Sequence, residues 1–211
     1  MKKGMRISLV VCLLAVLFLA TTSNAELFNR GTDSLGYRLI YDSDLDITWY
    51  DFSNSQNIWV DQIAWAATLS VDFGGNTLDG WRLPSTVDDD SSFYFNVTTS
   101  EMGHLFYTEL GNVAQSGMPI NTGIFQNLYE VVYWSGTSFT PTANFPQPDD
   151  GWVFNFSTGN QGTSGENNDL HALAVHNGDV AIIPEPISSV LFIAGGALLA
   201  GRRFLGKKKI I

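Results

Sequence analysis

The chain has 211 residues and a formal net charge of −10, with 21 Asp and Glu against 11 Lys and Arg. Most of the cations lie near the two ends, so residues 26–183 carry 20 acids and three arginines, a formal charge of −17. Such a surface repels phosphate groups, which argues against nucleic acid as a partner and against docking on anionic lipid. Aromatic residues make up 13% of the chain, so this acidic segment can bury a core and is not a disordered tail.

Residues 1–25 are typical of a secretory signal peptide. A basic flank precedes an apolar run over residues 7–20. Ser23 and Ala25 place small residues at positions −3 and −1, so we expect export through the Sec translocon and cleavage by signal peptidase before Glu26. The run is short for a hydrocarbon core of about 30 Å, which favours a cleaved signal over a retained anchor.

The only cysteine of the chain, Cys12, lies inside the signal run. The mature chain therefore has no cysteine, which excludes disulfides, thiolate catalysis and cysteine-ligated zinc. The histidines show none of the spacings of a zinc motif. Ser135 has no Gly-x-Ser-x-Gly context, and no glycine-rich phosphate loop precedes a predicted helix.

Residues 26–183 are expected to form one extracytoplasmic domain with two helices. Apolar spacing predicts the first helix over residues 58–71, ended by the glycines at 74–75. It predicts the second over residues 99–110. A capping box is expected at the start of that second helix, where Thr98 is the cap and the side chain three residues later reaches back to it.

Short β-branched and aromatic runs predict five strands. These strands cover residues 37–41, 47–50, 131–135, 152–156 and 170–175. The last three are expected to share a sheet, and the Gly-rich residues 159–165 are expected to form a hairpin loop. The order of elements predicts an α+β fold rather than a doubly wound parallel sheet.

Two short motifs carry a resemblance to a known family. They are Trp81, Arg82, Leu83 and Pro84, followed later by Tyr133, Trp134 and Ser135. With residues 41–49 and 100–106 they resemble the Lcl C-terminal type of domain, which is similar to formylglycine-generating-enzyme and C-type-lectin-like folds. The resemblance covers residues 37–180 and implies a compact C-type-lectin-like domain with two helices and short antiparallel strands. The chain departs from the family where its last strand usually carries an Arg, because His176 stands there.

Arg82 is the only cation between residues 39 and 201. It has two interpretations. One is a clamp for a sugar acid or another carboxylate ligand. The other is a structural arginine, satisfied by backbone carbonyls or a nearby Asp and stacked on Trp81. We favour the structural role.

Asp42, Asp44 and Asp46 have the alternate spacing of a calcium loop and are the candidate metal ligands. An EF-hand has Gly at the sixth position and Glu at the twelfth, where this chain has Ile47 and Ser53. The sequence therefore excludes an EF-hand. It leaves two alternatives, a weak calcium site and a turn with solvated carboxylates.

Residues 184–211 have the features of a sorting tail. A Pro-Glu-Pro sequence precedes an apolar helix predicted over about residues 187–205, and a basic end follows. At a rise of 1.5 Å per residue this helix is about 28 Å long, a marginal membrane span whose basic end should stay cytoplasmic. The residues of the motif are Pro184, Glu185, Pro186, Arg202 and Arg203.

These features, in this order, resemble the PEP-CTERM sorting tail of Gram-negative bacteria. The Lcl type of domain is often found ahead of such tails. The resemblance implies an exosortase, a membrane cysteine transpeptidase-like enzyme, as a partner that cuts near the Pro-Glu-Pro. It also implies a type I intermediate in the inner membrane, followed by release or transfer to the cell surface or extracellular matrix.

Together, these features predict an exported, non-catalytic surface or exopolysaccharide-matrix protein with a glycan- or matrix-binding domain. The alternative is a secreted carbohydrate-active hydrolase, which needs two carboxylates at a set separation in a cleft. A formylglycine-type oxidase is excluded, because its chemistry needs a cysteine pair. No cofactor is expected beyond the calcium considered above.

Overall fold

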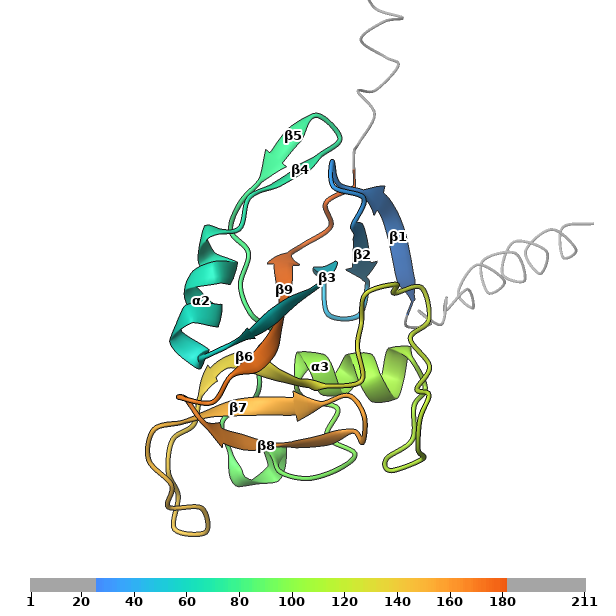
Figure 1. Ribbon diagram of the computed structural model, residues 1–211. Coiled ribbons are helices and arrows are strands. Elements are labelled where there is room, and N and C mark those ends of the chain that lie inside the picture. Colours follow the sequence, from blue (N-terminus) through green and yellow to red (C-terminus); the bar gives the residue numbers. More distant parts are fainter. Residues whose placement is uncertain (1–25, 182–211) are drawn as a thin grey trace, which may run out of the picture.

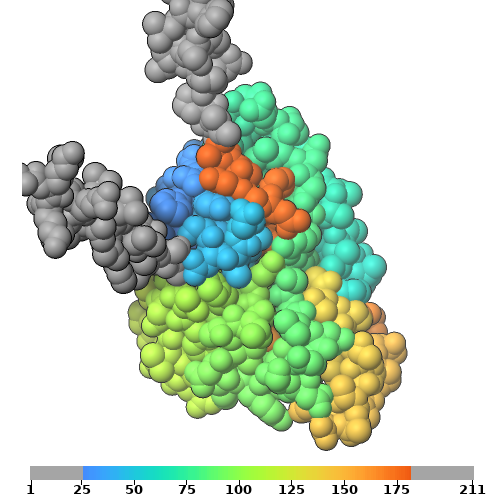
Figure 2. All heavy atoms as spheres, turned by 180° about the vertical axis from the view of Figure 1, so that it is seen from behind, coloured from blue at the N-terminus to red at the C-terminus, as the bar shows by residue number. Residues whose placement is uncertain are grey.

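The computed structural model describes residues 26–181, the coloured part of Figures 1 and 2. It shows an α+β fold, mostly of strands with two short α-helices (Figure 1). The predicted α+β class is therefore confirmed. The predicted signal peptide and the whole predicted tail, residues 184–211, lie outside the described residues. Within residues 26–181, no helix has both the length and the apolar character that a membrane crossing needs.

Seven strands form one sheet in the order β1-β2-β3-β9-β6-β7-β8. Their bounds are β1 Leu27–Thr32, β2 Arg38–Asp42, β3 Ile47–Asn57, β6 Val132–Ser138, β7 Asp150–Asn155, β8 Asn160–Gly165 and β9 Leu170–Asn177. The last strand, β9, lies in the centre. It pairs antiparallel with β3 and, at Tyr133 opposite His171, parallel with β6. In Figure 1, β9 links the upper group of strands, β1 to β3, to the lower group, β6 to β8.

The sheet packs against other parts of the domain on both of its faces. Adjacent residues of a strand point to opposite faces, and here such neighbours belong to different core clusters. Trp49 and Tyr133 belong to the larger core cluster, which packs against the segment that contains the second helix. Their chain neighbours Tyr50 and Trp134 belong to two other clusters, packed against the β4–β5 hairpin and the first helix. Trp49, Tyr133 and Trp134 are completely buried.

The first helix, α2, covers Trp59–Thr68 and is shorter than predicted. Val71 does not end the helix but begins β4 (Val71–Phe73), which pairs with β5 (Asn76–Leu78). The intervening glycines at 74–75 both have positive φ and form the hairpin turn. Val71 and Phe73 are buried on either side of an exposed residue, and this alternation favours a strand over a helix.

The second helix, α3, covers only Glu101–His104 and continues as a π-helical turn, η2 (Leu105–Glu109). Its cap is Ser100, whose Oγ accepts a hydrogen bond of 3.0 Å from the Gly103 N–H. The predicted capping box is wrong, because Thr98 is exposed and the Glu101 side chain binds elsewhere.

The five predicted strands are all present, four of them within three residues at each end, whereas β3 continues seven residues past the predicted end at Tyr50. The predicted loop over 159–165 is wrong. That segment is strand β8, paired with β7 along its whole length. Its inward polar residue, Gln161, is buried and bonded to Ser92 and Ser100, so the strand needs no apolar alternation. The described chain also contains β1 and a short 3₁₀ helix, η1 (Asp90–Ser92), which the sequence analysis did not predict.

Candidate functional site

A pocket of about 530 Å³ lies over the Trp81–Pro84 motif. Residues from α2, from the loop after β5, and from β6 and the end of β9 line it. They are Ile63, Ala67, Trp81, Arg82, Leu83, Ser85, Gly136, Thr137 and Asn177. The pocket combines an apolar wall with hydroxyl and amide groups, which is the usual composition of a small-molecule site.

Every N–H of the Arg82 guanidinium is already used. Two hydrogen bonds, of 2.8 and 2.7 Å, run to the two oxygens of Glu101. Nε and Nη2 donate to Asn177 Oδ1, and Nη1 donates to the Leu83 carbonyl at 3.1 Å. A guanidinium has five donors, so this network leaves none for a ligand.

Arg82 thus has one of the expected backbone-carbonyl partners, while its side-chain partners are a Glu and an Asn and not the expected Asp. The ring of Trp81 packs instead against Tyr50 and His176, at centroid distances of 5.5 and 5.4 Å. The expected stacking of Arg82 on Trp81 is absent from the cation–π contacts of residues 26–181, which involve only Arg30. Among residues 26–181, the buried Nδ1 of His176 has no hydrogen-bond partner.

The structure brings the two family motifs together. The Pro84 carbonyl accepts hydrogen bonds from Ser135 Oγ at 2.9 Å and from the Gly136 N–H at 2.7 Å. Trp134 donates from its indole to the Asn57 carbonyl, and Tyr133 shares its hydroxyl with Ser53. Ser135 and Gly136 therefore join β6 to the loop that carries Arg82, whereas Trp134 and Tyr133 bond β6 to β3.

The three candidate calcium ligands do not converge. Asp46 lies in the left-handed region, with φ of 50°, and accepts a hydrogen bond from the Tyr41 hydroxyl at 2.9 Å. Asp42 is completely buried. Its oxygens accept from two N–H groups of its own turn and from the indole of Trp49, at 3.2 to 3.3 Å. Within residues 26–181 these three carboxylates are not grouped around one position that could hold a metal ion, so the structure gives the weak calcium site no support. Asp42 also lacks the solvated carboxylate that the other alternative, a turn, expected.

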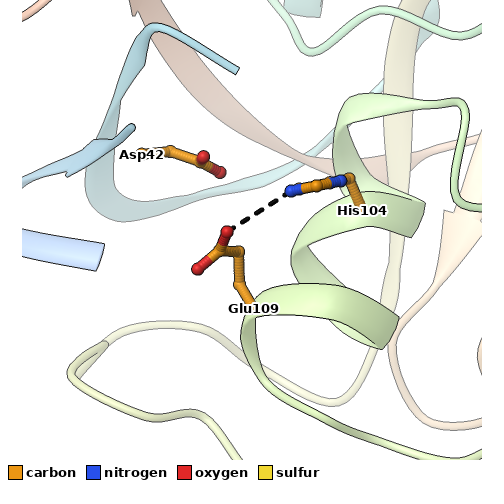
Figure 3. A group of neighbouring side chains, drawn as sticks. All are labelled: Asp42, His104 and Glu109. Atoms are coloured by element: carbon orange, nitrogen blue, oxygen red, sulfur yellow. Dashed lines mark hydrogen bonds and ion pairs between the residues drawn. The ribbon is translucent and has the colours of Figure 1, made fainter. Parts of the chain in front are cut away.

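Asp42 instead faces His104 and Glu109, and these three residues, here named the Asp42 cluster, are drawn in Figure 3. One ligand atom from each lies within 4.8 Å of the others. His104 Nε2 is 3.3 Å from Glu109 Oε1 and 3.8 Å from Asp44 Oδ2. Burial raises the pKa of both the Asp42 and the Glu109 carboxyl groups, and the charge of Asp42 raises that of Glu109 further.

The π-helical turn places Glu109 opposite His104. In a regular α-helix, residues five apart point in clearly different directions, whereas the wider π turn brings them close to one face. A prediction that treats residues 99–110 as a regular helix does not bring these two side chains together. The available signal was Glu109 itself, a charged residue at an inward position of the predicted apolar face.

The predicted sorting residues, Pro184, Glu185, Pro186, Arg202 and Arg203, lie outside the described residues. In comparisons with known proteins, no family model matches the chain, and no curated protein or solved structure matches it.

Proposed function

We propose that this chain is an exported, non-catalytic surface or exopolysaccharide-matrix protein, delivered through a PEP-CTERM tail that an exosortase processes. The observation that carries the proposal is the order of three features after the domain: Pro-Glu-Pro, an apolar run and a basic end. A signal-like N-terminus precedes the same domain. A type I membrane intermediate follows from these two ends.

The proposal includes a C-type-lectin-like character for residues 26–183 and a neutral saccharide as the ligand of the pocket. Two features support it. The family motifs meet through the Pro84 carbonyl, as expected if they act as one structural unit. The pocket offers the polar side chains of Ser85 and Thr137 beside the apolar Ile63, a combination suited to sugar hydroxyls and ring faces. Arg82 has no free donor for an acidic sugar.

Burial of the converging carboxylates supports a non-catalytic domain. Asp42 is completely buried, and the Glu109 side chain is 2% exposed. A glycoside hydrolase must fit a glycosidic oxygen between its two carboxyl groups, which requires an open cleft. The Asp42 cluster does not offer that access.

Sorting is tested in the native host with the variant Glu185→Ala. We expect this variant to remain full-length in the membrane fraction, because the exosortase needs its motif. Ser188→Ala, two residues beyond Pro186, is the matched control and should be processed like the parent chain. Cell fractionation and mass spectrometry of the C-terminus provide the readout. Normal processing of Glu185→Ala would contradict the proposal.

Binding is tested with the 26–183 fragment on a glycan array, paired with a hydrolysis assay on the glycans that bind. Ala67→Trp fills the pocket from the exposed side of α2 and should abolish binding without unfolding the domain. Ala64→Trp places the same side chain at an exposed position of α2 outside the pocket lining and is the control. Hydrolysis of a bound glycan would favour the alternative, a carbohydrate-active hydrolase.

A further inference from the structure

The Asp42 cluster brings together side chains from two distant parts of the chain. Asp42 ends β2, whereas His104 and Glu109 lie on the α3–η2 segment more than 60 positions later. In Figure 3 the three side chains point toward one another from these two elements. Asp44, in the turn after β2, approaches His104 from the same side, at 3.8 Å.

The cluster holds more negative than positive charge. Asp42, Asp44 and Glu109 supply three carboxylates, and His104 is the only basic group among residues 26–181 that contacts them. Residues 26–181 contain no lysine.

The three arginines of residues 26–181 have other partners. Arg30 pairs with Asp179 and Arg82 with Glu101, while Arg38 donates to a backbone carbonyl. Buried charges are usually paired or coordinate a metal ion, so the surplus of carboxylates calls for a cation from outside the chain.

One ligand pair already has the spacing that an ion needs, and the other ligand atoms of the cluster, within 4.8 Å of one another, would close in on the ion. Ligands on a tetrahedral zinc ion at about 2.0 to 2.1 Å lie about 3.4 Å apart. His104 Nε2 and Glu109 Oε1 are 3.3 Å apart. Asp42 is oriented by the N–H groups of its own turn and by the Trp49 indole, the kind of support that fixes metal ligands.

The cluster also has an entry side. The His104 side chain is 14% exposed and that of Asp44 is 31% exposed, whereas Glu109 is nearly covered. An ion can therefore reach the imidazole past Asp44 and then lie over the buried carboxylates. The π-helical turn that makes this arrangement is a feature often found at functional sites.

We propose that Asp42, His104 and Glu109 bind a divalent transition-metal ion, with Asp44 as the fourth ligand and Zn²⁺ as the ion that fits best. An imidazole suits zinc and its neighbours in the first transition row, whereas calcium takes oxygen ligands alone. This site differs from the predicted calcium loop, because Asp46 is not part of it. It is also independent of sorting and of saccharide binding.

The first experiment uses the full chain, purified in detergent and stripped with a chelator. Isothermal titration with Zn²⁺ should give one ion per chain, and the melting temperature should rise as zinc is added. Ca²⁺ and Mg²⁺ at the same concentrations should give neither effect. A chain that does not respond to Zn²⁺, or that binds Ca²⁺ equally well, would overturn the proposal.

The variants separate a metal site from a structural ion pair. Glu109→Gln keeps the shape of the side chain and should weaken zinc binding by at least about 100-fold, since even supporting residues of metal sites cost 10- to 100-fold. It should also raise the melting temperature of the metal-free chain, because it removes an unbalanced buried charge. A purely structural cluster predicts the reverse: a lower melting temperature and no zinc response in the parent chain.

Asp46→Asn is the matched control, because it removes a carboxylate from the same turn outside the cluster. It should leave zinc affinity within about twofold of the parent value. An equal loss in Asp46→Asn and Glu109→Gln would show general attraction to an acidic surface and would overturn the proposal. His104→Gln should weaken zinc binding as strongly as Glu109→Gln, since it removes the only nitrogen ligand of the proposed site. It should lower the melting temperature of the metal-free chain, because the carboxylates lose their basic partner.

Discussion

Arg82 and Glu101 are joined by two parallel hydrogen bonds of 2.8 and 2.7 Å across 19 positions of the chain. The same carboxylate also accepts the Ser85 N–H at 2.7 Å. Glu101 begins α3, so this pair fixes the Trp81–Pro84 loop to the segment that carries the Asp42 cluster.

Arg82→Ala should lower the free energy of unfolding by about 2 kcal/mol, because it leaves the Glu101 carboxylate without its main partner. Arg82→Lys should recover only part of the loss, since an ammonium cannot make the paired contact. Arg30→Ala, which breaks the more exposed pair with Asp179, should cost less than about 1 kcal/mol. Urea unfolding measures all three. Unchanged stability with lost ligand binding in Arg82→Ala would restore the ligand-clamp interpretation.

Ser100→Ala should destabilise the domain by about 1 to 2 kcal/mol, because the hydroxyl both caps Gly103 and bonds the buried Gln161. Thr98→Ala removes a hydroxyl from an exposed position only two residues earlier and should change stability by less than about 0.5 kcal/mol. Thermal or chemical unfolding distinguishes them. A larger effect at Thr98 would mean that the predicted capping box, not the observed cap, holds the helix.

Gly103→Ala should be among the most damaging single substitutions in the domain. A Cβ at this position would lie 2.1 Å from the Val97 carbonyl oxygen, so the backbone must shift. Gly162→Ala is the control, because its nearest neighbour would be a side-chain oxygen at 3.8 Å. We expect a loss of soluble Gly103→Ala, or a melting temperature at least several degrees lower, and near-parent behaviour for Gly162→Ala. Equal melting temperatures would refute the close packing of α3.

Alkaline pH should destabilise the domain through Tyr133. Burial raises the pKa of its hydroxyl to about 12, whereas an unfolded tyrosine ionises near 10. Between these values the unfolded chain loses the proton first, so stability falls as pH rises, by up to about 1.4 kcal/mol per pH unit.

Tyr133→Phe should show a shallower decline in stability over the same pH range, although its lost hydrogen bonds lower its stability at neutral pH. Tyr129→Phe, at a half-exposed tyrosine, is the control and should keep the parent slope. Urea unfolding at pH 9 to 12 gives the slopes. A slope that is the same in Tyr133→Phe and the parent would contradict the pKa direction.

The sequence predicted the strands that are rich in apolar and aromatic side chains. Residues 131–135 and 152–156 are apolar and aromatic, and both lie in the core sheet. Strand β8 could not be predicted in this way, because its pattern of Asn, Gln, Gly, Thr and Ser is that of a loop. Its conformation depends on pairing with β7 and on the buried bonds of Gln161, which are contacts between distant parts of the chain.

The candidate metal sites also depend on contacts between distant parts of the chain, which the sequence does not show. The alternate spacing of Asp42, Asp44 and Asp46 is visible in the sequence, but a tight turn sends Asp46 toward Tyr41 and Asp42 into the core. His104 and Glu109, which face Asp42, lie on the α3–η2 segment. The position of Glu109 opposite His104 depends on the π-helical turn. Local spacing does not encode that turn, so the cluster emerges only in three dimensions.

The central place of β9 sets a condition on how the domain is completed. A chain that crosses a membrane N-terminus first delivers β1 to β3 and then β6 to β8 as two separate sets of strands. Neither set has a lasting neighbour on its inner edge until residues 170–177 arrive between them. Under the export proposed above, threading of the polypeptide must therefore be nearly finished before the sheet closes, and the inner edges of β3 and β6 stay unpaired until then.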